Sequence, residues 1–409
     1  MKRDLPEAMA DIVSRRSDAE LTVQRALQAV RTHLGMEVAY LSEFVGDMSV
    51  YRSVDAPGLE HLIKPGDSRS LDDVYCRHIL AGRLPELIPD TAREPLAQEM
   101  PITTQTPIGS HASVPLRLPD GELYGMFCCL SPHPNTSLNP RDLQILRLFA
   151  DMAGDLVSRD VAAERVRSAQ ISQVERVIAE KHYGIVFQPI WSFHHDAPVG
   201  FEALCRFHAE PYRPPNEWFD EAAGVGLGPA LEREVLATTL EVARDLPDGA
   251  YLSVNASPEL LTTIDHEALL LDHGDRQLVI EITEHAPVAD YAVLQAALAP
   301  LRQRGVQLAV DDAGAGFSSL HHVLQLQPDI IKLDLSLTRG IDADAARRAL
   351  ASALIYFARE TNATIVAEGV ETEDERQTLI ELGISNGQGY LLGRPDNTAN
   401  SGRSPTRIG

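Results

Sequence analysis

One short apolar stretch ends in two adjacent carboxylates, and this pattern restricts how the chain around it folds. Val306–Val310 has the mainly apolar character of a buried strand, and Asp311 and Asp312 follow it directly. Successive strand residues point in opposite directions, so the two carboxylates converge only if the strand ends there. Gly314 and Gly316 would let the backbone turn at that point. An acidic turn with no further role is the alternative, because Asp and Gly are common turn residues.

Strand-like runs recur through the second half of the chain, with helical stretches between most of them. This alternation predicts an α/β fold, a (β/α)8 barrel of the TIM type, in residues 182–396. In such a barrel the functional residues collect at the carboxyl ends of the strands. The predicted strands are Ile185–Ile190, Val199–Phe207, Tyr251–Val254, Leu278–Ile282, Val306–Val310, Ile330–Leu333 and Thr364–Ala367, with an eighth unit at Gly387–Tyr390.

Polar side chains of one chemical kind lie near the ends of these strands. A charge inside an apolar strand costs free energy unless it is paired or bound to a metal. One such residue could be a structural ion pair, but five consecutive units carry them, and this indicates a shared site. The set consists of five carboxylates (Glu202, Glu281, Asp311, Asp312 and Glu368), the Asn255 amide and the Lys332 ammonium.

The oxygen-rich composition of this set indicates the ligand that it binds. Carboxylate and amide oxygens without thiolates favour Mg²⁺ or Mn²⁺ over structural zinc. So many negative charges make two ions more plausible than one. Two ions about 3.5–4 Å apart can hold a water and a phosphoryl oxygen, an arrangement suited to phosphodiester hydrolysis.

Charge and cysteine content restrict the partners. The formal net charge of -23 argues against binding to duplex nucleic acid or anionic membranes, and a phosphate-bearing substrate would need local cations. The four cysteines show no metal-ligand spacing, and Cys128 and Cys129 are expected to be buried thiols. There is no signal-type or membrane-spanning apolar run, so we expect a cytoplasmic location without membrane contact.

The first half of the chain resembles a GAF domain. The segments "SLDDVYCRHILAGRLPELIPD" and "SVPLRLPDGELYGMFCCLS" look like the central helix and final hairpin of that α+β family. We expect a flexible N-terminus in residues 1–17, the GAF-like domain in 18–160, a helical linker in 161–181 and a disordered tail in 397–409. One long helix is predicted from Pro140 to about Lys181.

The ligand of the GAF-like domain is not specified by its residues. Members of that family bind small ligands or simply dimerise, and Cys76 with His78 is better explained as core and surface than as a metal site. The linker has an imperfect heptad pattern, which allows either a dimeric coiled coil or a solvated single helix. We expect a homodimer, with an unknown small ligand or none at this domain.

The second half resembles the EAL domain, the family of cyclic di-GMP phosphodiesterases. The motifs that carry the resemblance are "QPI", "GFEALCRF", "SVNAS", "EITE", "DDAGAGFSS", "IIKLD", "AEGVET" and "GQGYLLGRP". The resemblance implies hydrolysis of cyclic di-GMP to linear 5′-pGpG, regulated by the first domain. A cyclic di-GMP receptor that binds without turnover is the main alternative, and a metal phosphodiesterase of another specificity is a third.

The same resemblance implies a role for each site residue. One metal would be held by Glu202, Asn255, Glu281 and Asp311, and a second by Asp311, Asp312 and Glu368. Lys332, Glu368 and Glu202 would form the catalytic group, Gln188, Leu204, Arg206 and Gln388 would contact substrate or water, and Glu284 would anchor the loop Ala313–Ser319. The chain departs from the family pattern at Ala223, Ala313 and Ala315, and none of these departures removes a metal ligand.

Overall fold

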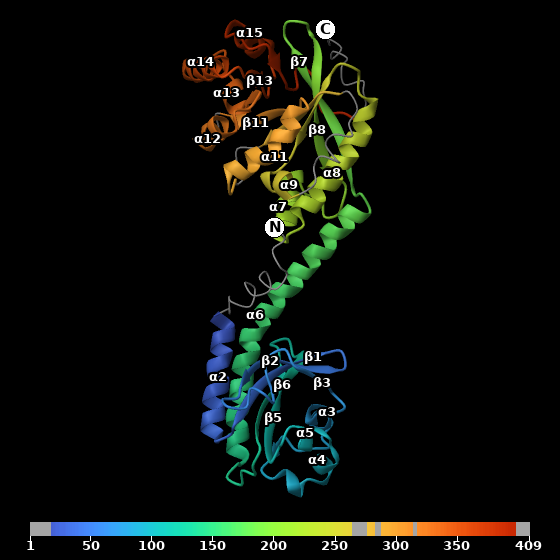
Figure 1. The fold of residues 1–409 in the computed structure, drawn as a ribbon, viewed down its shortest axis with the longest axis vertical. Helices are drawn as coiled ribbons and strands as arrows, with labels where there is room; N and C mark the ends of the chain where they lie inside the picture. Colours follow the sequence, from blue (N-terminus) through green and yellow to red (C-terminus); the bar gives the residue numbers. More distant parts are fainter. Residues whose placement is uncertain (1–17, 264–275, 283–287, 314–316, 398–409) are drawn as a thin grey trace. The chain divides into compact units, whose positions relative to one another are not determined.

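A computed structural model describes residues 18–263, 276–282, 288–313 and 317–397 of the chain. It divides into two compact units, Met1–Val166 (unit 1) and Arg167–Gly409 (unit 2), each of which is described separately (Figure 1). Glu284, Ala315 and most of the tail 397–409 lie outside the described residues, as does the predicted flexible N-terminus. Within the described part of the chain, no helix has the length and apolar character needed to cross a membrane.

Unit 1 is built on a six-stranded antiparallel sheet with the strand order β3-β2-β1-β6-β5-β4. The predicted hairpin is confirmed, with its turn at Pro119–Gly121. The strands are β1 (Val38–Val45), β2 (Met48–Asp55), β3 (Ser68–Ser70), β4 (Leu87–Ile88), β5 (Ser110–Arg117) and β6 (Leu123–Ser131).

Helices cover both faces of this sheet, because its strand residues alternate between two apolar clusters. Cys128 packs in the cluster under the short helices, and Cys129 packs in the cluster under the two long ones; both thiols are fully buried, as predicted. The long helices are α2 (Asp18–Leu34) and α6 (Pro140–Ala179), and the short ones are α3 (Tyr75–Leu80), η1 (Thr91–Arg93), α4 (Pro95–Glu99) and α5 (Ile102–Gln105).

Helix α6 confirms the long helix predicted from the sequence. The Asn139 side chain accepts a hydrogen bond from the backbone N–H of Arg141, which caps the start of the helix. Leu146 and Ala150 of its first half are buried against the sheet of unit 1. Val174 and Val177, near its end, are buried in an apolar cluster of unit 2.

Unit 2 is a closed eight-stranded barrel, and this confirms the predicted fold (Figure 1). All neighbouring strands from β8 to β14 run parallel, whereas β7 is antiparallel to both of its neighbours. A repeated βα unit would predict only parallel pairs, but the turn at residues 193–196 is too short for a crossover and makes a hairpin. The strands are β7 (Tyr183–Ser192), β8 (Ala197–Phe207), β9 (Tyr251–Asn255), β10 (Leu278–Ile282), β11 (Gln307–Ala313), β12 (Ile330–Leu333), β13 (Thr364–Ala367) and β14 (Asn386–Gly387).

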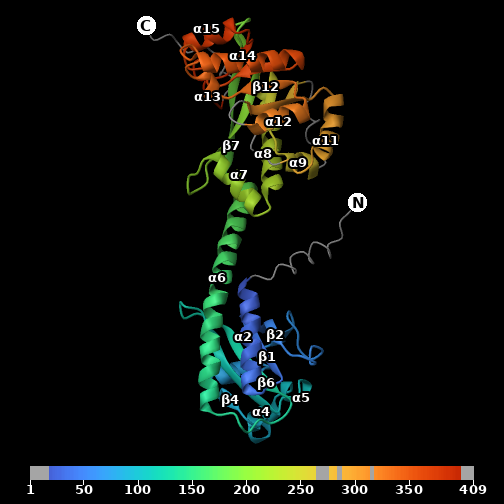
Figure 2. The same ribbon diagram turned by 90° about the vertical axis from the view of Figure 1, so that its left-hand side faces the viewer.

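Helices surround the barrel and bury the outward side chains of its strands (Figures 1 and 2). Ile280 and Ile282 of β10, for example, belong to the apolar cluster that also contains Leu294 and Leu298 of α11. The helices are α7 (Pro215–Gly224), α8 (Gly228–Val242), η2 (Ala243–Asp245), α9 (Pro258–Thr263), α11 (Tyr291–Gln303), α12 (Phe317–Leu326), α13 (Leu335–Thr338), α14 (Ala345–Glu360) and α15 (Glu373–Glu381).

Candidate active site

The inside of the barrel has an apolar layer with a polar layer above it. Ile190, Val279, Ala309, Ile330 and Val366 form a buried apolar cluster inside the barrel. Each apolar residue of this cluster has a polar residue two positions away in the sequence, at the same end of the barrel. The two side chains share the inward face because alternate strand residues point the same way. The polar positions are Gln188, Glu281, Asp311, Lys332 and Glu368.

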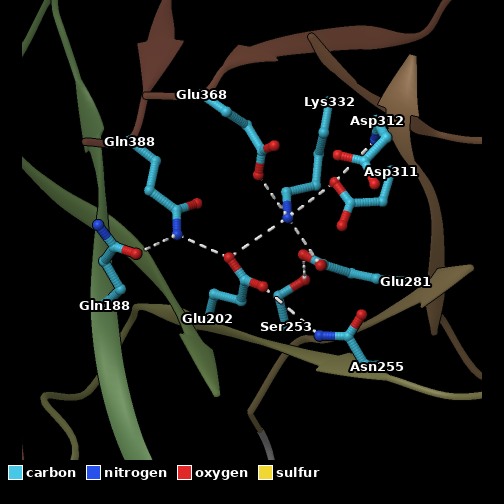
Figure 3. Close-up of polar contacts among 10 residues, drawn as sticks. All are labelled: Gln188, Glu202, Ser253, Asn255, Glu281, Asp311, Asp312, Lys332, Glu368 and Gln388. Atoms are coloured by element: carbon cyan, nitrogen blue, oxygen red, sulfur yellow. Dashed lines mark hydrogen bonds and ion pairs between the residues drawn. The ribbon is translucent and has the colours of Figure 1, made fainter. Parts of the chain in front are cut away.

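Lys332 lies at the centre of the polar layer and is 1% exposed. Figure 3 shows its ammonium among four carboxylates, three of them on different strands (β8, β10 and β11) and the fourth, Glu368, directly after β13. Its Nζ lies 2.8 Å from Glu281 Oε2 and 2.8 Å from Glu368 Oε1. It lies 3.1 Å from Asp311 Oδ1 and 3.3 Å from Glu202 Oε2. The structure thus brings together side chains that are up to 166 residues apart in the sequence (368 minus 202).

Amide side chains hold Glu202 from two sides. Gln388 Nε2 donates to Glu202 Oε2 at 2.6 Å and is also 3.0 Å from Gln188 Oε1. On the other side, Asn255 Nδ2 donates to Glu202 Oε1 at 3.5 Å. Gln188 in turn donates to the backbone carbonyl of Gly393 at 3.2 Å. Both oxygens of Glu202 are therefore oriented by hydrogen bonds.

Ser253 is a site residue that was not predicted from the sequence. It is 1% exposed, and its hydroxyl donates to Glu281 Oε1, while Lys332 binds the other oxygen of the same carboxylate. Ser253 precedes Asn255 by two residues on β9, so the two side chains share the inward face of that strand. That spacing is the signal that could have identified it.

The two aspartates converge through an irregularity within β11. The pairing of β11 with β12 shifts between Val310 and Ala313, and Asp312 has a φ of 55°. The strand therefore continues to Ala313, beyond its predicted end at Val310. A local bulge allows adjacent side chains to reach one side of a strand. The backbone N–H of Asp312 donates to Asp311 Oδ1 at 3.0 Å, which fixes that carboxylate.

The acids of the site differ in the direction of their pKa shifts, although burial raises the pKa of each. Burial raises the pKa of Glu368 to about 8 against the opposing effect of Lys332, with Asp311 and Glu202 adding to the increase. Burial and the nearby Glu202 raise the pKa of Glu281 well above its usual value. Burial also opposes ionisation of Glu202, but Lys332 and the hydrogen bond from Gln388 keep its pKa below the usual range.

The ammonium of Lys332 stays charged despite its burial. Burial by itself lowers the pKa of a lysine, but Asp311, Glu202, Glu281 and Glu368 together raise it well above its usual value. One ammonium cannot neutralise all the carboxylates around it, and the raised pKa values of Glu281 and Glu368 reflect their burial together with that excess of negative charge. Further positive charge would therefore be favourable at this site.

The donor atoms fit two divalent ions. Glu202, Glu281 and Asp311 each offer an oxygen within 4.8 Å of the others, and so do Asp311, Asp312 and Glu368. Asp311 belongs to both sets, so two ions held there would share a ligand. All of these donors are hard oxygens, which suits Mg²⁺ or Mn²⁺.

A cavity of about 360 Å³ lies between β8, α7 and α8 and reaches this site. Leu204 and Arg206, predicted to bind substrate, line it together with Asn255 and Glu281. Arg206 is half-buried and donates to the carbonyl of Cys205, so its side chain lies along the cavity wall. Ala223 is exposed on α7, and Ala313 is fully buried. In unit 1, Cys76 is buried in the core and His78 is half-buried.

Comparison with known protein families finds two domains, in the order expected from the sequence motifs. Residues 171–395 match the EAL domain and residues 18–156 match the GAF domain.

Curated relatives match somewhat more than half of the chain. Cyclic di-GMP phosphodiesterase PdeF of Escherichia coli is 27% identical over 239 residues, which cover 56% of this chain and 32% of the relative. Cyclic di-GMP phosphodiesterase PA2567 of Pseudomonas aeruginosa is 29% identical over 276 residues, which cover 62% of this chain and 47% of the relative. The chain thus spans about a third of the length of the first relative and just under half of the second.

Solved structures show the same barrel. An EAL domain protein from Listeria monocytogenes is 24% identical with a TM-score of 0.50, covering 55% of this chain and 93% of that chain. The FimX EAL domain from Pseudomonas aeruginosa, bound to c-di-GMP, is 20% identical with a TM-score of 0.51, covering 57% and 98%. At these identities the similarity shows the fold alone.

Proposed function

This chain belongs to the EAL-domain family, and on that basis we propose that unit 2 hydrolyses cyclic di-GMP to linear 5′-pGpG with two Mg²⁺ or Mn²⁺ ions. The main support is the complete set of five carboxylates around Lys332, in two groups that share Asp311. Two curated relatives that match 56% and 62% of the chain are named cyclic di-GMP phosphodiesterases.

The proposed metal ligands follow the two groups of donors. Glu202, Asn255, Glu281 and Asp311 would hold one ion, and Asp311, Asp312 and Glu368 the other. When bound, the ions supply charge neutralisation and an activated water for attack on the phosphodiester.

The chain itself supplies orientation and one fixed positive charge. Lys332 holds its ammonium between the carboxylates, where it can donate a hydrogen bond to the attacking water and stabilise negative charge in the transition state. Gln388 positions Glu202 and stays within reach of the same water. Leu204 provides an apolar contact, and Arg206 provides a guanidinium for a phosphate of the cyclic dinucleotide.

We further propose a regulatory role for unit 1. The GAF-like domain (18–160) would act through the helical linker (161–181) on the rate of the EAL domain (182–396), in a cytoplasmic homodimer. Glu284 would anchor the loop that contributes to the metal site. The small cavity in unit 1 measures about 20 Å³, room for a single water, so any ligand there requires the surrounding side chains to move.

The decisive experiment is incubation of the purified full-length protein with cyclic di-GMP and Mg²⁺ or Mn²⁺, with chromatographic detection of the linear product. Glu202→Gln keeps the size of a ligand but removes its charge and should lower kcat by at least about a hundredfold. Glu241→Gln changes an exposed acid on α8 and should leave the rate unchanged. Tight binding of cyclic di-GMP without turnover by the native protein would instead support the receptor.

A further inference from the structure

A stripe of exposed side chains runs along α6 on the surface of unit 1. Its apolar members include Leu148, Met152 and Val166, which are 59%, 49% and 60% exposed. Large apolar side chains at such exposure indicate a surface that can still be buried. The complete stripe consists of Leu148, Met152, Asp155, Arg159, Ala162 and Val166, all of them exposed.

The stripe lies on the side of α6 that faces away from the sheet. Its residues follow each other in alternating steps of four and three, the spacing that places side chains on one line of a helix. Leu146, Ala150 and Ala153 occupy the opposite side and pack in the core of unit 1. Figures 1 and 2 show α6 lying along unit 1 beside α2. One helix thus carries two separate faces, one packed on its own unit and one exposed.

The stripe is self-complementary in an antiparallel pair of α6 helices, because each residue then lies opposite a different residue that suits it. Against a second, antiparallel α6, Leu148 would lie opposite Val166 and Met152 opposite Ala162. At the middle, Asp155 would lie opposite Arg159, and the two-fold axis repeats all three pairs. A symmetric dimer requires such a self-complementary surface, in which residue i contacts j and j contacts i.

The charges at the middle of the stripe select the direction of pairing. A parallel pair would place Asp155 opposite Asp155 and Arg159 opposite Arg159, so like charges would face each other in two successive layers. The antiparallel pair converts both layers into ion pairs. Neither side chain has an ion-pair partner among the described residues, so both are available for one.

We propose that the stripe Leu148–Val166 of α6 pairs with the same stripe of a second copy of this chain, in an antiparallel dimer. This interface does not depend on the proposed hydrolysis. It also favours the coiled-coil interpretation of the heptad pattern, as an antiparallel pair whose contacts begin at Leu148, ahead of the linker (161–181), and continue into it as far as Val166.

Charge-reversal variants of the 409-residue protein test whether the stripe forms the dimer interface. Light scattering at high micromolar concentration should give the mass of a dimer. Asp155→Arg should raise the dimer dissociation constant about tenfold, because two ion pairs become two repulsions. The double variant Asp155→Arg with Arg159→Asp should restore the native constant, and Arg83→Asp, exposed elsewhere on unit 1, should leave it unchanged. A monomeric native protein, or no effect of Asp155→Arg, would overturn the proposal.

Cysteine crosslinking tests the direction. In the antiparallel pair Met152 lies next to Ala162 of the second copy, whereas the two copies of Met152 are about 15 Å apart along the axis. A mixture of Met152→Cys and Ala162→Cys proteins should therefore form a disulfide-linked dimer under mild oxidation. Each single variant alone should form no more than the native protein, because a disulfide needs closely placed Cα atoms. Efficient crosslinking of either single variant alone would show a parallel pair and refute the register.

Discussion

At the scale of single residues, the site depends on buried side chains that hold other side chains in place. Ser253 and Lys332 each bind one oxygen of Glu281, and Gln388 binds Glu202. None of these contacts lies within a single strand: the Ser253 bond joins neighbouring strands, and the Lys332 and Gln388 bonds reach across an intervening strand of the barrel. The carboxylates are thereby prepared for ions before any ion binds.

Removal of the Ser253 hydroxyl tests this orienting effect. Ser253→Ala should weaken Mn²⁺ binding about tenfold, because Glu281 loses the hydrogen bond that fixes one of its oxygens. Calorimetric titration with Mn²⁺ in the absence of substrate measures the effect. Ser192→Ala is a matched control, since Ser192 is buried on β7 but bonds only the backbone of His195. Equal Mn²⁺ affinity in native protein and Ser253→Ala would contradict the role.

Because His111 is buried, we expect the stability of unit 1 against unfolding to fall at acid pH. It is 2% exposed, its Nδ1 has no partner among the described residues, and burial lowers its pKa to about 4. The unfolded chain binds the proton at about pH 6.5, so the contribution of His111 to stability is complete above that pH. It is then lost as the pH falls toward 4, and we expect unit 1 to lose about 3 kcal/mol from this group.

Denaturant unfolding of unit 1 between pH 7 and 4 measures the loss. His111→Phe keeps an aromatic ring beside Tyr75 and should flatten the pH dependence, whereas His33→Gln, an exposed histidine of α2, should not. An identical pH profile for native protein and His111→Phe would show that other groups control the acid sensitivity.

At the scale of elements, local hydrogen bonds hold the segments that follow the strands of the site. Glu375 of α15 is 5% exposed and accepts hydrogen bonds from the backbone N–H groups of Gly340, Glu371 and Thr372. The Thr372 hydroxyl accepts a bond from the Glu375 N–H, which completes a capping box. One side chain thus links the loop after α13 to the loop that follows Glu368.

Glu375→Ala should therefore destabilise unit 2 by about 2 kcal/mol, because three backbone N–H groups lose the buried carboxylate that accepts their hydrogen bonds. Glu373→Ala, on the same helix but exposed, should cost about 0.5 kcal/mol or less. Urea unfolding followed by a unit 2 signal, such as fluorescence of Trp191 and Trp218, compares the two variants. Similar losses for both would show that Glu375 is not the link between the loops.

At the scale of the whole molecule, the chain is acidic, and the site of unit 2 gathers carboxylates whose charge bound ions would neutralise. The chain has a formal net charge of -23, and Glu202 and Glu281 beside Lys332 are among the few acids that are buried in the described residues. A metal that binds only the folded site stabilises that unit and leaves the other unaffected. The two units should therefore respond differently to Mn²⁺.

Calorimetry of the full-length protein should show two unfolding transitions. Mn²⁺ at a hundred times its dissociation constant should raise the free energy of unfolding of unit 2 by about 2.7 kcal/mol per site, and a chelator should reverse the gain. The transition of unit 1 should not move. Asp311→Asn removes the shared ligand and should abolish the shift, and an undiminished shift in that variant would place the ion elsewhere.

The sequence by itself determined the strands of the barrel, the inward position of the carboxylates and the long helix. These properties depend on local periodicity, two residues for a strand and 3.6 for a helix, which can be read from neighbouring positions. The tertiary structure alone decided which side chains touch: Ser253 with Glu281, Lys332 with four acids, and the bulge that turns Asp312 toward Asp311. Such contacts depend on strand register and barrel closure, which set distances between residues that are far apart in the chain.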